Sequence, residues 1–358
     1  MPVVDRGLCF VDALSIAVTA NLPVLLWGAP GTGKTSAVLT LGERLGLPAE
    51  VVVGSIREPS DFAGLPVLRD GRTWFAPPRW AERLAESGTG ILFLDELTTA
   101  PPAVQAAMLR VVLERAVGDL TLPGSVRIVA AANPPEQAAD GWDLSAPLAN
   151  RLIHLDWTVS AASVADGFTG GFPAPSLPGF GSSADVHRAR ALVGAFLRVR
   201  PELVLSVPGG PARAWPSPRT WELAAIALAH TADAPAEVRA ELVVGAVGEA
   251  AGYELLSWLR DLDLPDPETL LADPDAPLPS RVDRVHAVLG SVVAHVAADG
   301  GADTWERAWT LIARVARRTP DVAATAARSL AARRPRGAAL PETVLGLAPI
   351  LRSAGLLP

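Results

Sequence analysis

The chain has 358 residues, of which 49% are hydrophobic and 19% are charged, and its net charge is −7 at neutral pH. This composition excludes a disordered chain, predicts two or three domains, and argues against a general affinity for nucleic acid. The single cysteine, Cys9, excludes an internal disulfide and a multi-cysteine zinc site and fits a reducing, cytoplasmic location. We predict no signal peptide and no membrane span, since apolar runs such as residues 287–298 are too short to cross a bilayer.

Strand and helix patterns alternate along residues 1–160. Short apolar runs predict strands at 22–27, 50–53, 90–94, 126–132 and 152–157, and periodic segments predict helices at 33–45 and 101–115. Nearly continuous apolar strands joined by helices are typical of a parallel sheet covered on both faces. The expected fold class is therefore α/β, with helices on both sides of a parallel sheet.

A hairpin is expected between the second and third of these strands. Asp70-Gly71 lies between short apolar runs within residues 65–76, and this dipeptide favours a two-residue turn. A hairpin is not part of a minimal strand–helix–strand unit, so we interpret it as an insertion. Trp74 and Phe75 near its tip either contact a partner or pack on the domain's own surface, and the sequence leaves both alternatives open.

The rest of the chain is predicted to be helical after a loop. Residues 161–185 are rich in glycine and proline and indicate a linker. Helical patterns follow at 186–198, 219–229, 237–248, 254–262, 281–298, 303–318 and 321–332. Residues 313–336 hold seven arginines against one acid, Asp321. A solvated arginine-rich face is favoured there over a surface for acidic partners or nucleic acid, because no aromatic residues are interleaved for base stacking.

An ungapped phosphate-binding motif follows the first predicted strand. The segment Gly28-Ala-Pro-Gly-Thr-Gly-Lys-Thr35 fits the pattern G-x-x-x-x-G-K-[ST] between a strand and a helix. Its glycines allow backbone N–H groups to turn toward phosphate oxygens, and the start of the next helix adds positive potential. Lys34 is the sole lysine among 31 basic residues, which indicates a position where a guanidinium will not serve. The residues expected to bind the nucleotide are Gly28, Pro30, Gly31, Thr32, Gly33, Lys34, Thr35 and Ser36.

Polar residues end two of the predicted core strands. Asp95 and Glu96 follow the third strand, and Asn133 follows the fourth. Ligands of open parallel sheets bind at the carboxyl ends of the strands, so these side chains are expected beside the phosphate loop. We expect Asp95 and Thr35 to hold Mg²⁺, Glu96 to activate water, and Asn133 to position that water. The alternatives are an acidic strand end that caps the next helix, and a simple Asn-Pro turn.

These motifs, in this order, resemble those of AAA+ ATPases. The hairpin insertion, Glu58-Pro-Ser-Asp61 with Gly64 ahead of it, and Leu148-Ala-Asn-Arg151 after the Asn133 strand are similar to the MoxR and dynein-related branch. The resemblance covers residues 8–160 and extends to a helical lid near 186–262. Family members usually show Asp-Arg-Phe where this chain has Asn150-Arg151-Leu152, so the arginine matches and its neighbours do not.

The resemblance assigns roles to two arginines. Arg151 corresponds to the arginine finger that reaches the nucleotide of the neighbouring subunit, and the alternative is a surface arginine at a helix end. Arg219, which opens a predicted helix, corresponds to the sensor arginine of the lid. The alternative for Arg219 is a helix-start arginine paired with Glu222.

The resemblance also implies a domain plan and a function. It divides the chain into a nucleotide-binding core (1–160), a linker (161–185), a helical lid (186–275) and a helical C-terminal region (276–358). It implies ATP and Mg²⁺ as cofactors, a homo-oligomeric ring, most simply a hexamer, and chaperone-like remodelling of a separate protein with a von Willebrand factor A-type domain. The alternatives are an ATP-gated switch with slow hydrolysis and a motor stimulated by nucleic acid. The second is disfavoured by the net charge.

Overall fold

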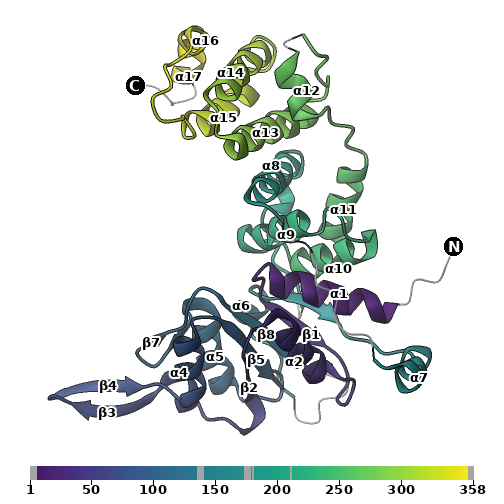
Figure 1. Cartoon of the computed structure of the whole chain (residues 1–358), viewed down its shortest axis with the longest axis vertical. Helices are drawn as coiled ribbons and strands as arrows, with labels where there is room; N and C mark the ends of the chain where they lie inside the picture. Colours follow the sequence, from purple (N-terminus) through teal and green to yellow (C-terminus); the bar gives the residue numbers. More distant parts are fainter. Residues whose placement is uncertain are drawn as a thin grey trace. The chain divides into compact units, whose positions relative to one another are not determined.

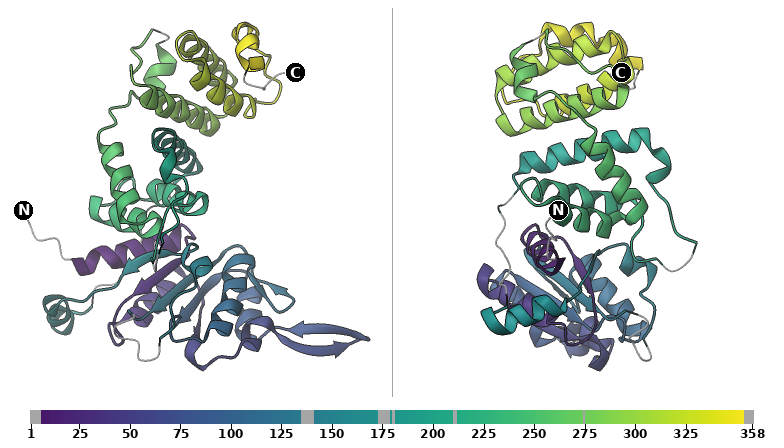
Figure 2. Two further views of the ribbon diagram at one scale, coloured as in Figure 1. Left: turned by 180° about the vertical axis from the view of Figure 1, so that it is seen from behind. Right: turned by 90° about the vertical axis from the view of Figure 1, so that its right-hand side faces the viewer.

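A computed structural model of the protein describes residues 6–134, 141–172, 179, 181–209, 212–273 and 275–353. The chain folds into two compact units (Figures 1 and 2). The first contains Met1–Phe180 and Leu205–Gly252, and the second contains Gly181–Val204 and Tyr253–Pro358. Among the helices of the described residues, none is both long and apolar enough to cross a membrane.

A parallel sheet forms the centre of the first unit. Its five strands lie in the order β2-β5-β8-β1-β9. They are β1 (Val24–Trp27), β2 (Ala49–Val53), β5 (Gly90–Asp95), β8 (Val126–Ala132) and β9 (Ile153–Asp156). All pairings are parallel, and Trp27 at the end of β1 lies opposite Ala132 on one side and Asp156 on the other. The predicted α/β class is confirmed, and every predicted strand is found within two residues of its expected ends.

Helices cover both faces of this sheet, since its strands are too apolar to face water. The helices of the first unit are α1 (Arg6–Thr19), α2 (Lys34–Leu45), α3 (Ser60–Ala63), α4 (Arg79–Ser87), α5 (Pro102–Glu114), α6 (Ala146–Ala149), α7 (Ala161–Gly170), α9 (Pro218–His230) and α10 (Ala236–Val247). Helix α10 packs on α1 and on β9. This approach is close, because a Cβ on Gly245 would lie 2.2 Å from the carbonyl oxygen of His154.

The predicted hairpin insertion is present and projects from the first unit (Figure 1). Strands β3 (Leu65–Arg69) and β4 (Arg72–Ala76) pair in an antiparallel register around Asp70-Gly71, and both turn residues have positive φ. All five residues of β3 are exposed, and Phe75 is 42% exposed. A second, shorter hairpin, β6 (Ala116–Val117) with β7 (Leu120–Thr121), was not expected from the sequence.

The predicted linker contains a helix. Helix α7 occupies Ala161–Gly170, so an extended loop over 161–185 is wrong for these ten residues. A capping box starts the helix: Ser160 Oγ accepts from the Ser163 N–H at 3.0 Å, and Ser163 Oγ accepts from the Ser160 N–H at 3.1 Å. The glycines that suggested a linker lie at the helix end, where Gly171 has a φ of 89°. Residues 173–178 and 180 of this prediction lie outside the described residues.

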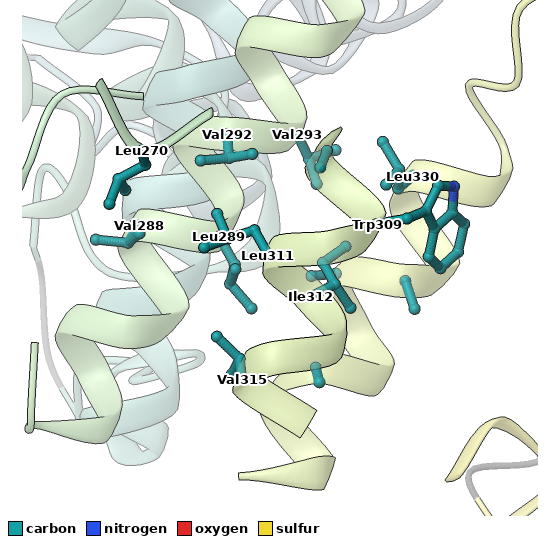
Figure 3. Packing of buried hydrophobic residues seen from close by; sticks show 14 of the residues in the cluster. Leu270, Val288, Leu289, Val292, Val293, Trp309, Leu311, Ile312, Val315 and Leu330 are labelled. Atoms are coloured by element: carbon teal, nitrogen blue, oxygen red, sulfur yellow. The ribbon is translucent and has the colours of Figure 1, made fainter. Parts of the chain in front are cut away.

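The second unit is helical. It contains α8 (Ser183–Val199), a short 3₁₀ helix η3 (Pro201–Leu203), most of α11 (Glu249–Arg260), α12 (Pro267–Ala272), α13 (Val282–Asp299), α14 (Ala302–Ala316), α15 (Pro320–Ala331), α16 (Glu342–Gly346) and α17 (Ala348–Ser353). Leucine, valine and isoleucine side chains from α12 to α15 form its core (Figure 3). Trp305 and Trp309 pack edge to face in this core, with ring centroids 5.8 Å apart.

The helices of the predicted lid, residues 186–275, do not all belong to the same compact unit. Helices α9 and α10 belong to the unit that holds the sheet, whereas α8 belongs with the C-terminal helices and packs mainly on α13. The assignment of residues 186–275 as a lid therefore stays a prediction. The amphipathic pattern of a helix shows that it has an apolar face but does not show which other helix covers that face.

We predict that Trp305→Ala strongly destabilises the second unit. The Trp305 side chain is 1% exposed and its indole N–H donates to the Leu330 carbonyl at 3.0 Å. Truncation leaves a cavity and an unpaired carbonyl, so the free energy of unfolding should fall by about 3–5 kcal/mol. Urea titration followed by circular dichroism measures this change. The control is Tyr253→Ala, since Tyr253 is 59% exposed, and equal effects of the two substitutions would contradict the assigned core.

Candidate nucleotide-binding site

The phosphate-binding motif forms the loop between β1 and α2. Gly31 and Gly33 have φ values of 77° and 87°, in the left-handed region that favours glycine. Gly33 is the N-cap of α2, so the loop leads directly into the positive end of that helix. Thr32 Oγ1 donates to the Ala29 carbonyl at 2.7 Å and closes the turn. The loop thus has the backbone geometry that an anion site requires.

Lys34 lies within this loop. Its side chain is buried, and Nζ donates to the carbonyl oxygens of Gly28 at 2.6 Å and Ala29 at 2.9 Å. Burial lowers the pKa of Lys34, and the negative charge of Asp95 opposes that shift. The ammonium group is therefore held by neutral carbonyls of the loop, so its charge is not cancelled by a bound carboxylate. This arrangement suits a group that neutralises phosphate.

Trp157, just beyond β9, holds the loop in place. Its backbone N–H donates to the Trp27 carbonyl at 2.6 Å, and its indole N–H donates to the Thr32 carbonyl at 3.0 Å. A Cβ on Gly28 would lie 2.5 Å from the Trp157 carbonyl oxygen. Only glycine leaves room for this approach, which explains the first glycine of the motif in this chain.

Asp95 and Thr35 meet at the carboxyl edge of the sheet. Thr35 Oγ1 donates to Asp95 Oδ2 at 3.0 Å, and the other carboxylate oxygen of Asp95 accepts from the Glu96 N–H at 2.9 Å. A hydroxyl and a carboxylate at this separation are hard oxygen donors of the kind that Mg²⁺ prefers, and Mg²⁺ typically keeps several waters as well. The two side chains fit the metal role predicted for them.

Glu96 adopts a left-handed backbone conformation, with a φ of 56°. Its carboxylate accepts a hydrogen bond from Ser55 Oγ, and its carbonyl accepts from Thr99 Oγ1 at 2.8 Å. Ser55 follows β2, the neighbour of β5 in the sheet. The sequence analysis missed Ser55, because a serine after a strand has no signal of its own until the order of the strands is known.

Asn133 lies at the end of β8, beside β5. It is half-buried, and its carbonyl accepts from Thr98 Oγ1 at 3.3 Å. Strand order therefore brings Asp95, Glu96 and Asn133 to one edge of the sheet, next to the phosphate loop. The functional role of Asn133 stays a prediction.

A cavity of about 510 Å³ lies beside the loop within the first unit. Its lining includes Phe10 of α1, Trp27, Gly28, Thr32 and Trp157. The size is in the range of small-molecule sites, and apolar rings line one part of it while loop backbone lines another. The surroundings of the loop can thus hold more than a phosphate group.

Comparison with known proteins identifies this part of the chain. Residues 23–152 match the family described as "AAA domain (dynein-related subfamily)". This segment is similar to AAA domains of the dynein-related subfamily, and it is called the AAA domain below. The match includes the phosphate loop, the hairpin insertion, Asp95, Glu96, Asn133 and Arg151, and it confirms the resemblance stated from the motifs.

Relatives of the AAA domain include proteins named as a chaperone and as a regulatory protein. The chain is 31% identical to Chaperone MoxR1 of Mycobacterium tuberculosis over 138 residues. The aligned segment covers 35% of this chain and 33% of that protein. It is 33% identical to the Nif-specific regulatory protein of Azorhizobium caulinodans over 171 residues. This aligned segment covers 42% of this chain and 26% of that protein. The structural alignment to a solved protein from Cytophaga hutchinsonii covers 72% of this chain and 89% of that chain, at 18% identity and a TM-score of 0.44. The chain spans about a third or less of the length of the curated relatives it matches.

The two predicted arginines lie near each other in the same chain. Arg151 donates to the Pro147 carbonyl, and its pKa is lowered by burial and by the positive charge of Arg219. Arg219 is exposed in the first turn of α9. The positive charges of Arg151 and Arg219 therefore act on each other within one chain. The structure of one chain does not test which subunit's nucleotide Arg151 would reach, so its finger role stays a prediction.

Asn150 connects the Arg151 segment of the AAA domain to helix α9. Asn150 Oδ1 accepts from Ser217 Oγ at 2.8 Å, and Asn150 Nδ2 donates to the Trp215 carbonyl at 3.4 Å. Ser217 is the N-cap of α9, the helix that begins next to Arg219. An amide donates and accepts at once, whereas an ionised carboxylate only accepts. The asparagine that departs from the family's usual aspartate therefore suits this two-way contact.

A buried aromatic pair supports the start of the phosphate loop. The Trp27 indole N–H donates to His154 Nδ1 at 2.8 Å, and the rings stack at a centroid distance of 6.1 Å. His154 Nε2 lies 2.9 Å from the Ala149 carbonyl, so the neutral ring carries its proton on Nε2 and donates it there. The Arg213 guanidinium covers the Trp27 ring at 4.3 Å. Burial lowers the pKa of His154 to about 4, and the Arg213 charge contributes to that shift.

We predict that Gly28→Ala weakens nucleotide binding by about tenfold or more. The added methyl would lie 2.5 Å from the Trp157 carbonyl oxygen, so the loop must move away from β9. Titration with a fluorescent ATP analogue measures the affinity. The matched control is Gly124→Ala, where a Cβ meets nothing within 4 Å. Undiminished binding by Gly28→Ala would show that the loop does not depend on this contact.

We predict that the AAA domain loses stability as the pH falls from 6.5 to about 4, the two pKa values of His154. In that interval the unfolded chain binds a proton on this imidazole while the folded chain does not, so protonation favours unfolding, by up to about 3 kcal/mol. Urea titrations at several pH values measure the slope. His154→Gln should flatten it, whereas His187→Gln, a partly exposed histidine of the second unit, should leave it unchanged. The interpretation fails if the two variants have the same pH dependence.

Proposed function

We propose that the chain is a Mg²⁺-dependent ATPase of the AAA+ class that uses ATP hydrolysis to remodel a partner protein. The observation that carries this proposal is the cluster of Lys34, Thr35 and Asp95 on a phosphate loop of an AAA domain. Loop N–H groups and Lys34 would hold the phosphates, and Thr35 and Asp95 would hold Mg²⁺, which neutralises charge on the phosphates when bound. The neighbouring cavity has room for the nucleoside.

The remaining residues of the site divide the catalytic work in this proposal. Glu96 accepts a proton from the attacking water or orients it, and Asn133 positions that water. Arg219 and, from the next subunit, Arg151 stabilise negative charge that develops on the phosphates. An arginine supplied by a neighbour makes hydrolysis depend on assembly, so the active form is a ring, which we propose to be a hexamer.

The partner is proposed to be a separate protein with a von Willebrand factor A-type domain. The resemblance to the MoxR branch supports this proposal, and so does the 31% identity to a protein named as a chaperone. The exposed β3–β4 hairpin offers apolar side chains such as Leu68, 78% exposed, for contact with a client. Hydrolysis would then be converted to motion that is passed to the client.

One observation favours an alternative of slow hydrolysis. The hydrogen bond from Ser55 occupies the Glu96 carboxylate, which must contact the attacking water to act as the catalytic base. A chain in which this contact persists with ATP bound would act as an ATP-gated assembly switch. The net charge of −7 argues against the other alternative, a motor stimulated by nucleic acid.

We predict that ATP turnover per subunit rises with protein concentration and falls by about 100-fold or more in Glu96→Gln. The rise reflects assembly of sites that are shared between subunits, and the fall reflects loss of the residue that activates water. Phosphate release measures the turnover. The matched control is Glu86→Gln, an exposed carboxylate on α4, which should retain full activity.

Two other outcomes have distinct meanings. Tight binding of ATP with turnover near that of Glu96→Gln at every concentration would support the switch instead of the motor. Failure to bind ATP at all would contradict both readings of the site.

A further inference from the structure

A groove crosses the second unit, which does not contain the phosphate loop. Helices α8 and α15 both pack on α13, and the groove between them has a volume of about 360 Å³. Helices α8 and α13 are in close contact at its side, because a Cβ on Gly290 would lie 2.6 Å from the Ala191 Cβ. Apolar side chains form the floor, among them Leu289, Val293 and Ala326.

Basic side chains line the walls of this groove. Arg190, Arg198, Arg333, His187 and His286 all border it, and no aspartate or glutamate is among its lining residues in the described part of the chain. Arg198 donates to Thr325 Oγ1 at 3.2 Å and Arg333 donates to the Ser329 carbonyl at 2.9 Å, so both guanidinium groups are held by neutral oxygens. Their positive charge remains available to an anionic ligand.

The cationic surface continues beyond the groove on both sides of Arg198. One neighbouring hollow is lined by Arg198 together with Arg328 and Asp321. The other is lined by Arg198, Arg281 and Asp283, and there Arg281 already pairs with Asp283 at 2.7 Å. All three hollows share Arg198 as a lining residue, and a peptide segment can contact more of them at once than a compact small molecule can.

We propose that this groove binds an acidic, amphipathic peptide segment of a partner protein. Apolar side chains of the segment lie on the floor formed by Leu289 and Val293, and its carboxylates pair with Arg190 and Arg198. The groove lining in the described part of the chain includes no phenylalanine, tyrosine or tryptophan on which a base can stack, so a nucleic acid is the less suitable occupant. The surface lies outside the AAA domain and thus adds a recognition site to the proposed function.

The test is a selection of random 12-residue peptides displayed on phage against the full chain without ATP. Enriched sequences should combine aspartate or glutamate with leucine, isoleucine or phenylalanine. A fluorescein-labelled peptide of that kind should bind about tenfold more weakly to the double variant Arg190→Glu/Arg198→Glu, and salt should weaken its binding to the parent chain. Fluorescence anisotropy measures both effects.

The matched control is Arg317→Glu/Arg318→Glu, which makes the same charge change at exposed positions that do not line the groove. It should bind the peptide within about twofold of the parent. Circular dichroism checks folding, and Arg190→Gln/Arg198→Gln repeats the test with a milder change. Selection of no acidic peptides, or equal losses in groove and control variants, would overturn the proposal. Tighter groove-dependent binding of a labelled single-stranded DNA would also overturn it.

Discussion

The site depends on the close contact between the phosphate loop and the segment after β9. Strand β1 lies between β8 and β9, so the chain leaving β9 passes directly over the first glycine of the loop. Trp157 then holds both ends of this contact, with its backbone on Trp27 and its indole on Thr32. A loop held in this way keeps its N–H groups oriented before any ligand arrives, which lowers the entropy lost on binding.

The electrostatics of the site follow from that geometry. The loop carbonyls hold the Lys34 ammonium while burial makes its charge costly, and Asp95 provides a nearby opposite charge. A phosphate with its metal would complete this arrangement better than water does. Glu96 is placed differently, since its carboxylate is held by Ser55 from a neighbouring strand. The same sheet edge thus holds the Lys34 ammonium on neutral carbonyls and the Glu96 carboxylate in a hydrogen bond to Ser55.

The second unit carries many arginines around its apolar core, although the whole chain has a net charge of −7. Its core is built from leucine, valine and tryptophan, and its arginines lie on the surface of that core. Some arginines serve the fold, as Arg314 does by donating to the Ala276 carbonyl at 2.8 Å. Others, such as Arg198, border a hollow with an apolar floor. The arginine-rich segment, predicted to be a solvated face, is therefore partly structural, and one of its residues, Arg333, borders the same hollow.

The elements of the AAA domain were predictable because local patterns determine them. Continuous apolar runs predict buried strands, the glycine-lysine motif predicts a loop before a helix, and Asp70-Gly71 predicts a hairpin. The prediction of a linker over 161–185 was wrong for α7, because it rested on glycine and proline content alone. The Ser160–Ser163 capping box that starts this helix was recognised only in the structure.

The sequence alone determined the five strands of the sheet, the β3–β4 hairpin and the residues of the phosphate loop, since these depend on neighbours along the chain. The tertiary structure decided which strand ends meet, and so placed Ser55 against Glu96 and Arg219 near Arg151. It also decided that α8 packs on α13, although the two are far apart in sequence. The physical reason is that apolar burial is non-directional. A pattern shows that a face must be covered, and only shape complementarity and close packing select what covers it.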